Sequence, residues 1–124
     1  GTLDIRVPVT CHIEDTIQKL NKLSIKDWKF EILDQDESLY YDLKNPLVQS
    51  LWKAYQKVTG DTESIPTTTG GGTYAKSMNN CIAFGCAFPG VDNRIHQANE
   101  FVSVEDLLKQ VEIYHQAILN LLEQ

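Results

Sequence analysis

The sequence predicts an α/β (α+β) fold, and three observations lead to it. Residues 2–9 and 28–32 alternate apolar and polar side chains, with a helical apolar pattern between them. Cys81–Phe88 is an apolar run that is too short for a helix core and rich in small and aromatic residues, which is typical of a strand buried on both faces. Helix-capping residues bound two further helical patterns, at 45–60 and 103–122.

The first 37 residues predict a βαβ unit. The apolar face of the first strand comprises Leu3, Ile5, Val7 and Val9. A helix over about 12–23 follows, and a second strand over 28–32 would run parallel to the first through a right-handed crossover. Two strands and one helix make a poor sheet by themselves, and an acidic stretch, Asp34–Ser38, comes next. We therefore expect two domain parts, 1–37 and 38–124.

The second part begins and ends with a helix. Asn45 and Pro46 are expected to cap and start the first helix, and Gly60 to end it. The apolar face of this helix comprises Leu47, Val48, Leu51, Trp52, Tyr55 and Val58. A short strand is expected over 65–69. Ser103 should cap the closing helix, Val104–Leu122. The core-facing residues of that helix are expected to be Leu107, Leu108, Val111, Tyr114, Ile118 and Leu121.

Composition excludes several classes of function. The net charge of −6 argues against nucleic acid and anionic membranes as partners. No run reaches membrane-spanning length, and we expect no signal peptide. The three cysteines, Cys11, Cys81 and Cys86, have no framework spacing, which is typical of a reducing cytoplasm. Cys81 and Cys86 would face opposite sides of the predicted strand, so we expect small buried residues that do not pair.

The segment from Gly70 to Ser77 allows three interpretations. It nearly fits the phosphate-cradling pattern G-x-x-x-x-G-K-[ST], but Ala75 replaces the last glycine and a strand-like run follows in place of a helix. It could also be a flexible turn. We favour a third interpretation, in which the glycine triplet lets a substrate backbone or carboxylate lie against main-chain amides.

His96 and Arg6 are the remaining candidate site residues. A lone loop histidine is more often solvated than a ligand, but Asn99 and Glu100 beside His96 favour metal binding, because ligating imidazoles need a partner for the second nitrogen. His12 and His115 have no such neighbours and are expected at the surface. Arg6 is by default a solvated strand residue, and could instead clamp a carboxylate.

Two stretches together carry a family resemblance: GGGTYAKSMNNCIAFGCAFPG and RIHQANEFVSVEDL. They resemble the C-terminal end of dinuclear-zinc dipeptidases of the Xaa-His (carnosinase-like) type, in the aminoacylase- and carboxypeptidase-like metallopeptidase family. The resemblance covers nearly the whole chain. It implies that residues 1–37 are the second half of a ferredoxin-like lid domain. Residues 38–124 would be the C-terminal helix-strand-strand-helix part of a zinc-peptidase catalytic domain.

The resemblance also implies roles for individual residues. His96 would be a zinc ligand, Arg6 would hold the carboxylate of a dipeptide substrate, and Asn99 and Glu100 would support the ligand. Main-chain groups of Gly71, Gly72 and Thr73 would line the substrate pocket. Two zinc ions would activate the water that hydrolyses the peptide bond. Lys76 departs from the family pattern, where arginine is usual, so a bidentate contact there is not implied.

The family's other functional residues are missing from this sequence. It contains no His-x-Asp and no Glu-Glu pair, so the other metal ligands and the general base would lie in a missing N-terminal part of the parent. The chain alone should then be inactive, hold no catalytic residue, bind zinc weakly and self-associate. The alternative is a free-standing, non-catalytic module that binds a small anion or carboxylate through Gly70–Gly72 and Arg6.

Overall fold

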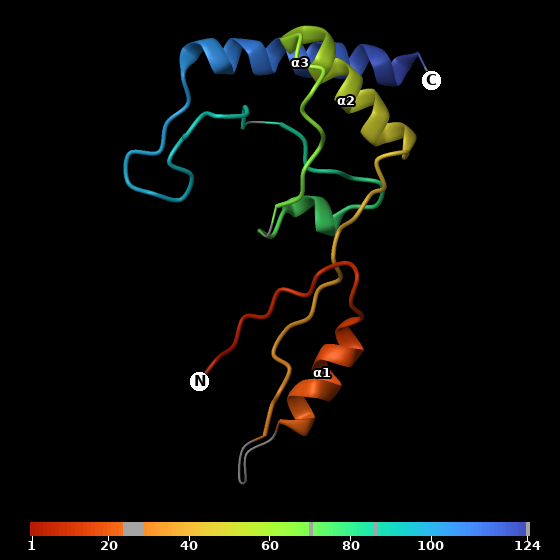
Figure 1. The fold of residues 1–124 in the computed structure, drawn as a ribbon, viewed down its shortest axis with the longest axis vertical. Helices are drawn as coiled ribbons and strands as arrows, with labels where there is room; N and C mark the ends of the chain where they lie inside the picture. Colours follow the sequence, from red (N-terminus) through yellow and green to blue (C-terminus); the bar gives the residue numbers. More distant parts are fainter. Residues whose placement is uncertain (24–28, 70, 86, 124) are drawn as a thin grey trace. The chain divides into compact units, whose positions relative to one another are not determined.

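The computed structural model describes residues 1–23, 29–69, 71–85 and 87–123. They contain helices α1 (Ile13–Lys22), α2 (Pro46–Thr59) and α3 (Val104–Leu122), and a short 3-10 helix, η1 (Tyr74–Ser77) (Figure 1). The chain divides into two compact units, Gly1–Tyr40 (unit 1) and Tyr41–Gln124 (unit 2). The boundary expected from the acidic stretch, after residue 37, falls just before this division.

No β-strand is assigned in the described part of the chain, so the α/β fold and the strands over 2–9 and 65–69 stay predictions. In the predicted strand Cys81–Phe88, Ile82 and Phe84 pack against the helical core, whereas Ala83 and Ala87 are exposed. Burial on both faces is therefore wrong for this chain, because no described element covers the second face. Trp28, Gly70 and Cys86, on which other expectations rested, lie outside the described residues.

Helix α1 forms where the sequence predicts it. Glu14 and Asp15 lie in its first turn and Lys19 and Lys22 in its last turn, so the charges at both ends suit the helix dipole. The apolar residues Ile13, Ile17 and Leu20 are half-buried. Within the same unit, the Ser38 hydroxyl donates a hydrogen bond of 2.9 Å to the Val7 carbonyl. This bond joins the two segments that flank α1.

Helices α2 and α3 form the core of unit 2. The ends of α2 confirm the prediction: the Asn45 side chain accepts a hydrogen bond from the Leu47 amide, and Gly60 is left-handed with φ of 73°. The residues buried between the two helices include Val48, Leu51 and Ala54 of α2 and Ile113 and Ala117 of α3. Ala54 is fully buried, so the helices approach closely at this point. The Asn120 side chain adds a 3.0 Å hydrogen bond to the Ser50 carbonyl.

The predicted core face of α3 is wrong, although its bounds and its Ser103 cap are confirmed. The buried residues of α3 are Gln110, Ile113 and Ala117. The residues expected to be buried are instead exposed by 38% to 60%: Leu107, Leu108, Val111, Tyr114, Ile118 and Leu121. The prediction followed hydrophobicity, whereas the small side chain of Ala117 allows α2 to come close. None of the described helices is both long and apolar enough to cross a bilayer.

Asp61 fastens the loop after α2. Its Oδ1 accepts hydrogen bonds of 3.0 Å from the Glu63 and Ser64 amides, and its Oδ2 accepts one of 2.8 Å from the Tyr55 hydroxyl. Hydrogen bonds from the Ser64 hydroxyl and amide, and then from Tyr55, lower the pKa of Asp61 to about 2. Burial, followed by the hydrogen bond to Asp61, raises the pKa of Tyr55 above its usual 10.0.

Candidate functional site

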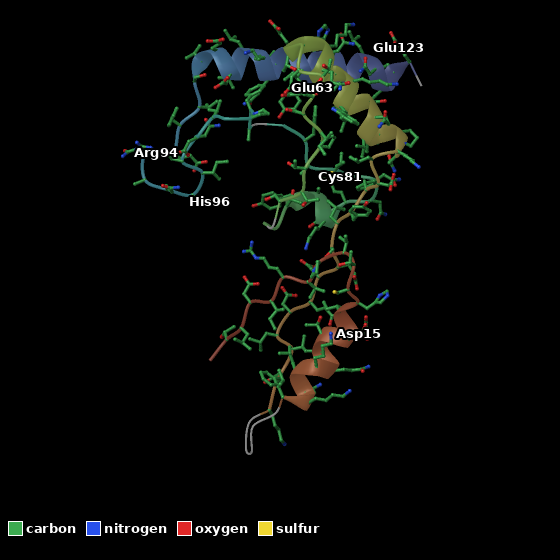
Figure 2. All side chains as sticks on the ribbon, in the orientation of Figure 1. Asp15, Glu63, Cys81, Arg94, His96 and Glu123 are labelled. Atoms are coloured by element: carbon green, nitrogen blue, oxygen red, sulfur yellow. The ribbon has the colours of Figure 1, made fainter. Side chains whose placement is uncertain are left out.

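His96 lies in a closed loop, residues 93–101, which we call the His96 loop (Figure 2). The Phe101 amide donates a 3.2 Å hydrogen bond to the Asn93 carbonyl and closes the neck of the loop. Inside it, the Gln97 amide bonds to the Arg94 carbonyl at 2.9 Å, and the Glu100 amide bonds to the Gln97 carbonyl at 3.3 Å. The loop therefore consists of two successive turns between η1 and α3, so His96 sits on a hydrogen-bonded scaffold.

The backbone of the His96 loop is strained at three residues other than glycine. Arg94, His96 and Asn99 have positive φ values of 54°, 62° and 62°. Such conformations cost roughly 1–3 kcal/mol each and persist where the surrounding structure holds them, often at functional sites. Asparagine tolerates this conformation better than arginine or histidine. The strain at Arg94 and His96 therefore marks this loop as a candidate site.

Glu100 contacts the backbone of His96. The His96 amide donates a hydrogen bond of 3.4 Å to Glu100 Oε2. The imidazole is exposed and makes no hydrogen bond or ion pair within the part of the chain that the structure describes. Glu100 can thus fix the position of His96 while both ring nitrogens stay accessible to a ligand.

The sequence gives no indication that the Asn93 side chain is buried. Its side chain is buried, with 8% exposed, and its Oδ1 is a buried acceptor without a hydrogen-bond partner among the described residues. An unmatched acceptor of this kind costs about 1–3 kcal/mol. The neighbouring Asp92 is equally polar in sequence, yet it is exposed and accepts a bond from the Arg94 amide.

The glycine segment lies before η1. Gly71 and Gly72 are exposed, and the Gly71 amide donates a 3.4 Å bond to the Thr69 hydroxyl. Thr73 caps η1 by accepting a bond from the Ala75 amide. Because η1 has only four residues, it lacks the long helix that a phosphate-cradling loop opens. No hydrogen bond or ion pair joins Gly71–Thr73 to the His96 loop among the described residues.

Arg6 belongs to unit 1 and pairs with a carboxylate of its own segment. Its guanidinium lies 4.0 Å from Asp4 Oδ2, and both side chains are largely exposed. Exposed pairs of this type contribute about 0–1 kcal/mol, so the contact between Arg6 and Asp4 is weak. The expected surface positions of His12 and His115 are confirmed, since both are exposed.

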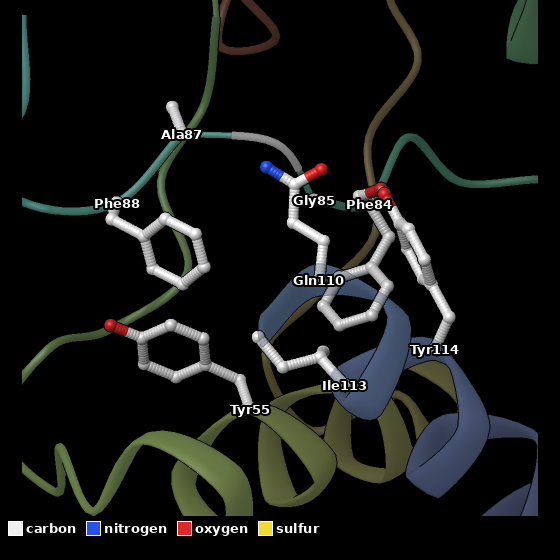
Figure 3. Close-up of a pocket in the computed structure, with 8 residues that line it drawn as sticks. All are labelled: Tyr55, Phe84, Gly85, Ala87, Phe88, Gln110, Ile113 and Tyr114. Atoms are coloured by element: carbon white, nitrogen blue, oxygen red, sulfur yellow. The ribbon is translucent and has the colours of Figure 1, made fainter. Parts of the chain in front are cut away.

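A small apolar cavity lies between α2, α3 and the segment that follows Cys81 (Figure 3). Its volume is about 30 Å³, and its walls are Tyr55, Phe84, Gly85, Ala87, Phe88, Gln110, Ile113 and Tyr114. The Phe84 and Tyr114 rings meet edge to face at 5.9 Å, and Lys109 Nζ lies 5.7 Å from the Phe88 ring centre. A space of this size is far below that of a ligand pocket, so we assign the cavity to packing.

The described residues contain no group of three or more histidine, cysteine, aspartate or glutamate side chains that could hold a metal ion. A zinc site needs three or four protein ligands. The exposed imidazole of His96, held by Glu100 through its backbone, is chemically suited to be one of them.

Comparisons with known proteins identify one family model and several bacterial proteins to which the chain is similar. The family model described as "Peptidase family M20/M25/M40" matches residues 2–120. A Staphylococcus haemolyticus protein named "Putative dipeptidase" is 36% identical over 121 residues, covering 96% of this chain and 25% of that protein. The Bacillus subtilis protein named "Putative dipeptidase YtjP" is 33% identical, with the same coverage. The chain thus spans about a quarter of the length of these relatives. No solved structure matches it significantly.

Proposed function

Because the chain belongs to peptidase family M20/M25/M40, we propose that it is the C-terminal part of a zinc-dependent dipeptidase of the Xaa-His (carnosinase-like) type. The family match over residues 2–120 and the dipeptidase names of the relatives support this proposal. The parent would hydrolyse the peptide bond of dipeptides. This chain would supply part of the site, and its own hydrolysis of dipeptides would be negligible.

The His96 loop is the observation that carries the proposal. His96 has a strained backbone, its amide donates a hydrogen bond to the Glu100 carboxylate, and its ring is accessible. This arrangement presents the imidazole at a fixed position. We assign His96 the role of a metal ligand and Glu100 the role of holding its backbone. Asn99 lies within the second of the two turns with a positive φ and would support the loop.

The bound metal would supply an activated water and polarise the peptide carbonyl. This chain's residues would bind and orient the substrate. Main-chain groups of Gly71, Gly72 and Thr73 would lie along the substrate backbone, and Arg6 would bind the carboxylate of the dipeptide.

The expectations about architecture form part of the same proposal. Residues 1–37 would be the second half of a lid domain, and 38–124 would be the C-terminal segment of an α/β catalytic domain. The protein would act in the cytoplasm. The remaining metal ligands and the general base would come from the N-terminal part of the parent, as an inserted lid needs at least two domains' worth of chain.

The test is a substitution in the full-length parent. We expect His96→Ala to abolish dipeptide hydrolysis nearly completely and to lower the bound zinc, while circular dichroism stays unchanged. His12→Ala is the matched control, because His12 is also exposed but lies in unit 1 at the start of α1. Unchanged turnover in a folded His96→Ala protein would refute the role of His96.

A further inference from the structure

The buried side chain of Asn93 lies in the same closed loop as His96. Its Oδ1 is shielded from solvent and has no hydrogen-bond partner among the described residues. The main-chain carbonyl of Asn93 is already engaged, because it accepts the bond from the Phe101 amide that closes the neck of the loop. Buried acceptors without a donor are rare in folded proteins, so Oδ1 indicates a binding group that this chain leaves unpaired.

The donor for Asn93 Oδ1 has to lie within reach inside the His96 loop, since the shielded oxygen is not in contact with bulk water. Many main-chain amides of the loop donate elsewhere, namely those of Arg94, His96, Gln97, Glu100 and Phe101. The His96 ring is three residues from Asn93, a stretch that spans at most about 11 Å even when extended. The turn that begins at Arg94 shortens this stretch further.

The His96 imidazole needs an acceptor if it is to bind a metal. A ligating imidazole almost always donates the N–H of its other ring nitrogen to an acceptor, which fixes the tautomer and the orientation of the ring. The Glu100 carboxylate already accepts the bond from the His96 main-chain amide. The Asn99 side chain is exposed, so a bond to it would only replace a bond to water, whereas a bond to Asn93 Oδ1 would satisfy a desolvated acceptor.

We propose that Asn93 is a positioning residue for the metal ligand, and that its Oδ1 accepts a hydrogen bond from the His96 ring nitrogen that does not bind the metal. This inference rests on the proposed function, in which His96 ligates zinc. The imidazole is exposed in this chain and would turn toward the neck of the loop when the site is assembled. The bond would fix which ring nitrogen carries the proton and which one is left for the metal.

Arg94 is the competing side-chain donor in the loop. Its guanidinium is exposed and carries a permanent charge, and a charge that moves from water to a shielded oxygen loses much more hydration than a neutral imidazole does. The neutral ring of His96 therefore suits Asn93 Oδ1 better.

The test compares the metal-free and zinc-loaded forms of the full-length parent. Asn93→Leu replaces the amide by an apolar side chain of similar size, and Asn79→Leu makes the same change at an exposed position outside the loop. Competition with a zinc chelator should show about a 10–100-fold loss of zinc affinity for Asn93→Leu and no loss for Asn79→Leu. Asn93→Asp keeps an acceptor oxygen and should retain most of the affinity. In the metal-free parent, the urea midpoint of Asn93→Leu should equal or exceed that of the wild type, because an unmatched acceptor is removed.

The His96 ring gives a direct readout of the same bond. With isotope-labelled histidine, nuclear magnetic resonance of the zinc-loaded parent should show a ring N–H signal that is protected from solvent exchange. Its absence from His96→Ala assigns it, and Asn93→Leu should lose its protection. Protection that persists in Asn93→Leu would show that another acceptor binds the ring and would overturn the proposal.

Two further results would overturn it. Equal zinc affinities of Asn93→Leu and Asn79→Leu would mean that Oδ1 binds only an enclosed water or Arg94. A lower urea midpoint of metal-free Asn93→Leu would mean that Oδ1 has a partner without the metal. If Asn93→Leu fails to fold, Asn93→Ala provides the affinity comparison. His96→Ala in the same chelator assay separates the two ideas: a loss of affinity in His96→Ala but not in Asn93→Leu refutes this inference alone, and an unchanged affinity in His96→Ala refutes both.

Discussion

The hydroxyl of Tyr114 occupies the space that a side chain on Gly85 would need (Figure 3). It donates a 3.2 Å hydrogen bond to the Phe84 carbonyl, and a Cβ at position 85 would overlap with it. Gly85 also has φ of 108°, which L side chains rarely adopt. This contact fixes the segment after Cys81 on α3, and together with the positive φ it favours glycine at position 85.

Gly85→Ala should therefore weaken unit 2. The substitution combines backbone strain with the loss of the Tyr114 hydrogen bond, so we expect a destabilisation of about 1–3 kcal/mol. Urea unfolding followed by circular dichroism measures it. Gly72→Ala is the matched control, because position 72 has open space and no positive φ. Equal unfolding midpoints for the two variants would contradict the assignment.

The hydrogen bonds that Asp61 accepts from Tyr55, Glu63 and Ser64 should make the stability of unit 2 depend on pH in the acid range. The folded pKa of Asp61, about 2, lies below its ordinary value of 3.8, so its contribution is fully present above about pH 4. The contribution is lost as the pH falls from 4 toward 2. Asp61→Asn should flatten the change in the urea midpoint across this window, whereas Asp36→Asn, in the exposed acidic stretch, should not. If the urea midpoint of Asp61→Asn fell with pH as steeply as that of the wild type, this role of Asp61 would be wrong.

We expect Glu100 to raise the metal affinity of the parent by fixing the position of His96. In the full-length parent, Glu100→Ala removes the acceptor for the His96 amide, and we expect the metal affinity to fall by about 10–100-fold. Glu100→Gln keeps an acceptor oxygen and should retain most of the affinity. Competition with a zinc chelator measures both. Glu112→Gln, on the exposed side of α3, controls for the loss of charge, and the assignment fails if Glu100→Ala binds zinc as tightly as this control.

The chain by itself should bind zinc only weakly. One imidazole is far short of the three or four ligands of a protein zinc site. Calorimetric titration of the isolated chain should therefore show no stoichiometric binding at micromolar zinc, and His96→Ala should change little. Tight one-to-one binding would show that this chain holds a complete site.

Local chemistry explains why some features could be predicted from the sequence. Asn45, Gly60 and Ser103 mark helix ends through hydrogen bonds and dihedral angles within a few residues, so the bounds of α2 and α3 follow directly. The buried side of α3 depends on a partner in space. Hydrophobicity selected Leu108 and Val111, while close packing against α2 selected Ala117.

Part of the candidate site could be predicted from the sequence. His96 and Glu100 stood out by residue type, and the structure adds the hydrogen bond that joins them. Positive φ at Arg94 has no sequence signal, because arginine has no preference for it. Burial of Asn93 likewise has no sequence signal, because it depends on the folded loop, whose neck closes with the hydrogen bond from the Phe101 amide to the Asn93 carbonyl.

Because the backbone of Arg94 is left-handed, glycine should stabilise the fold more than arginine at this position, which is the reverse of the usual order. Glycine normally weakens a fold by roughly 0.5–1 kcal/mol through its greater freedom in the unfolded chain. Relief of the conformational cost at Arg94, about 1–3 kcal/mol, exceeds that penalty. Laboratory evolution for heat tolerance should therefore enrich glycine at position 94.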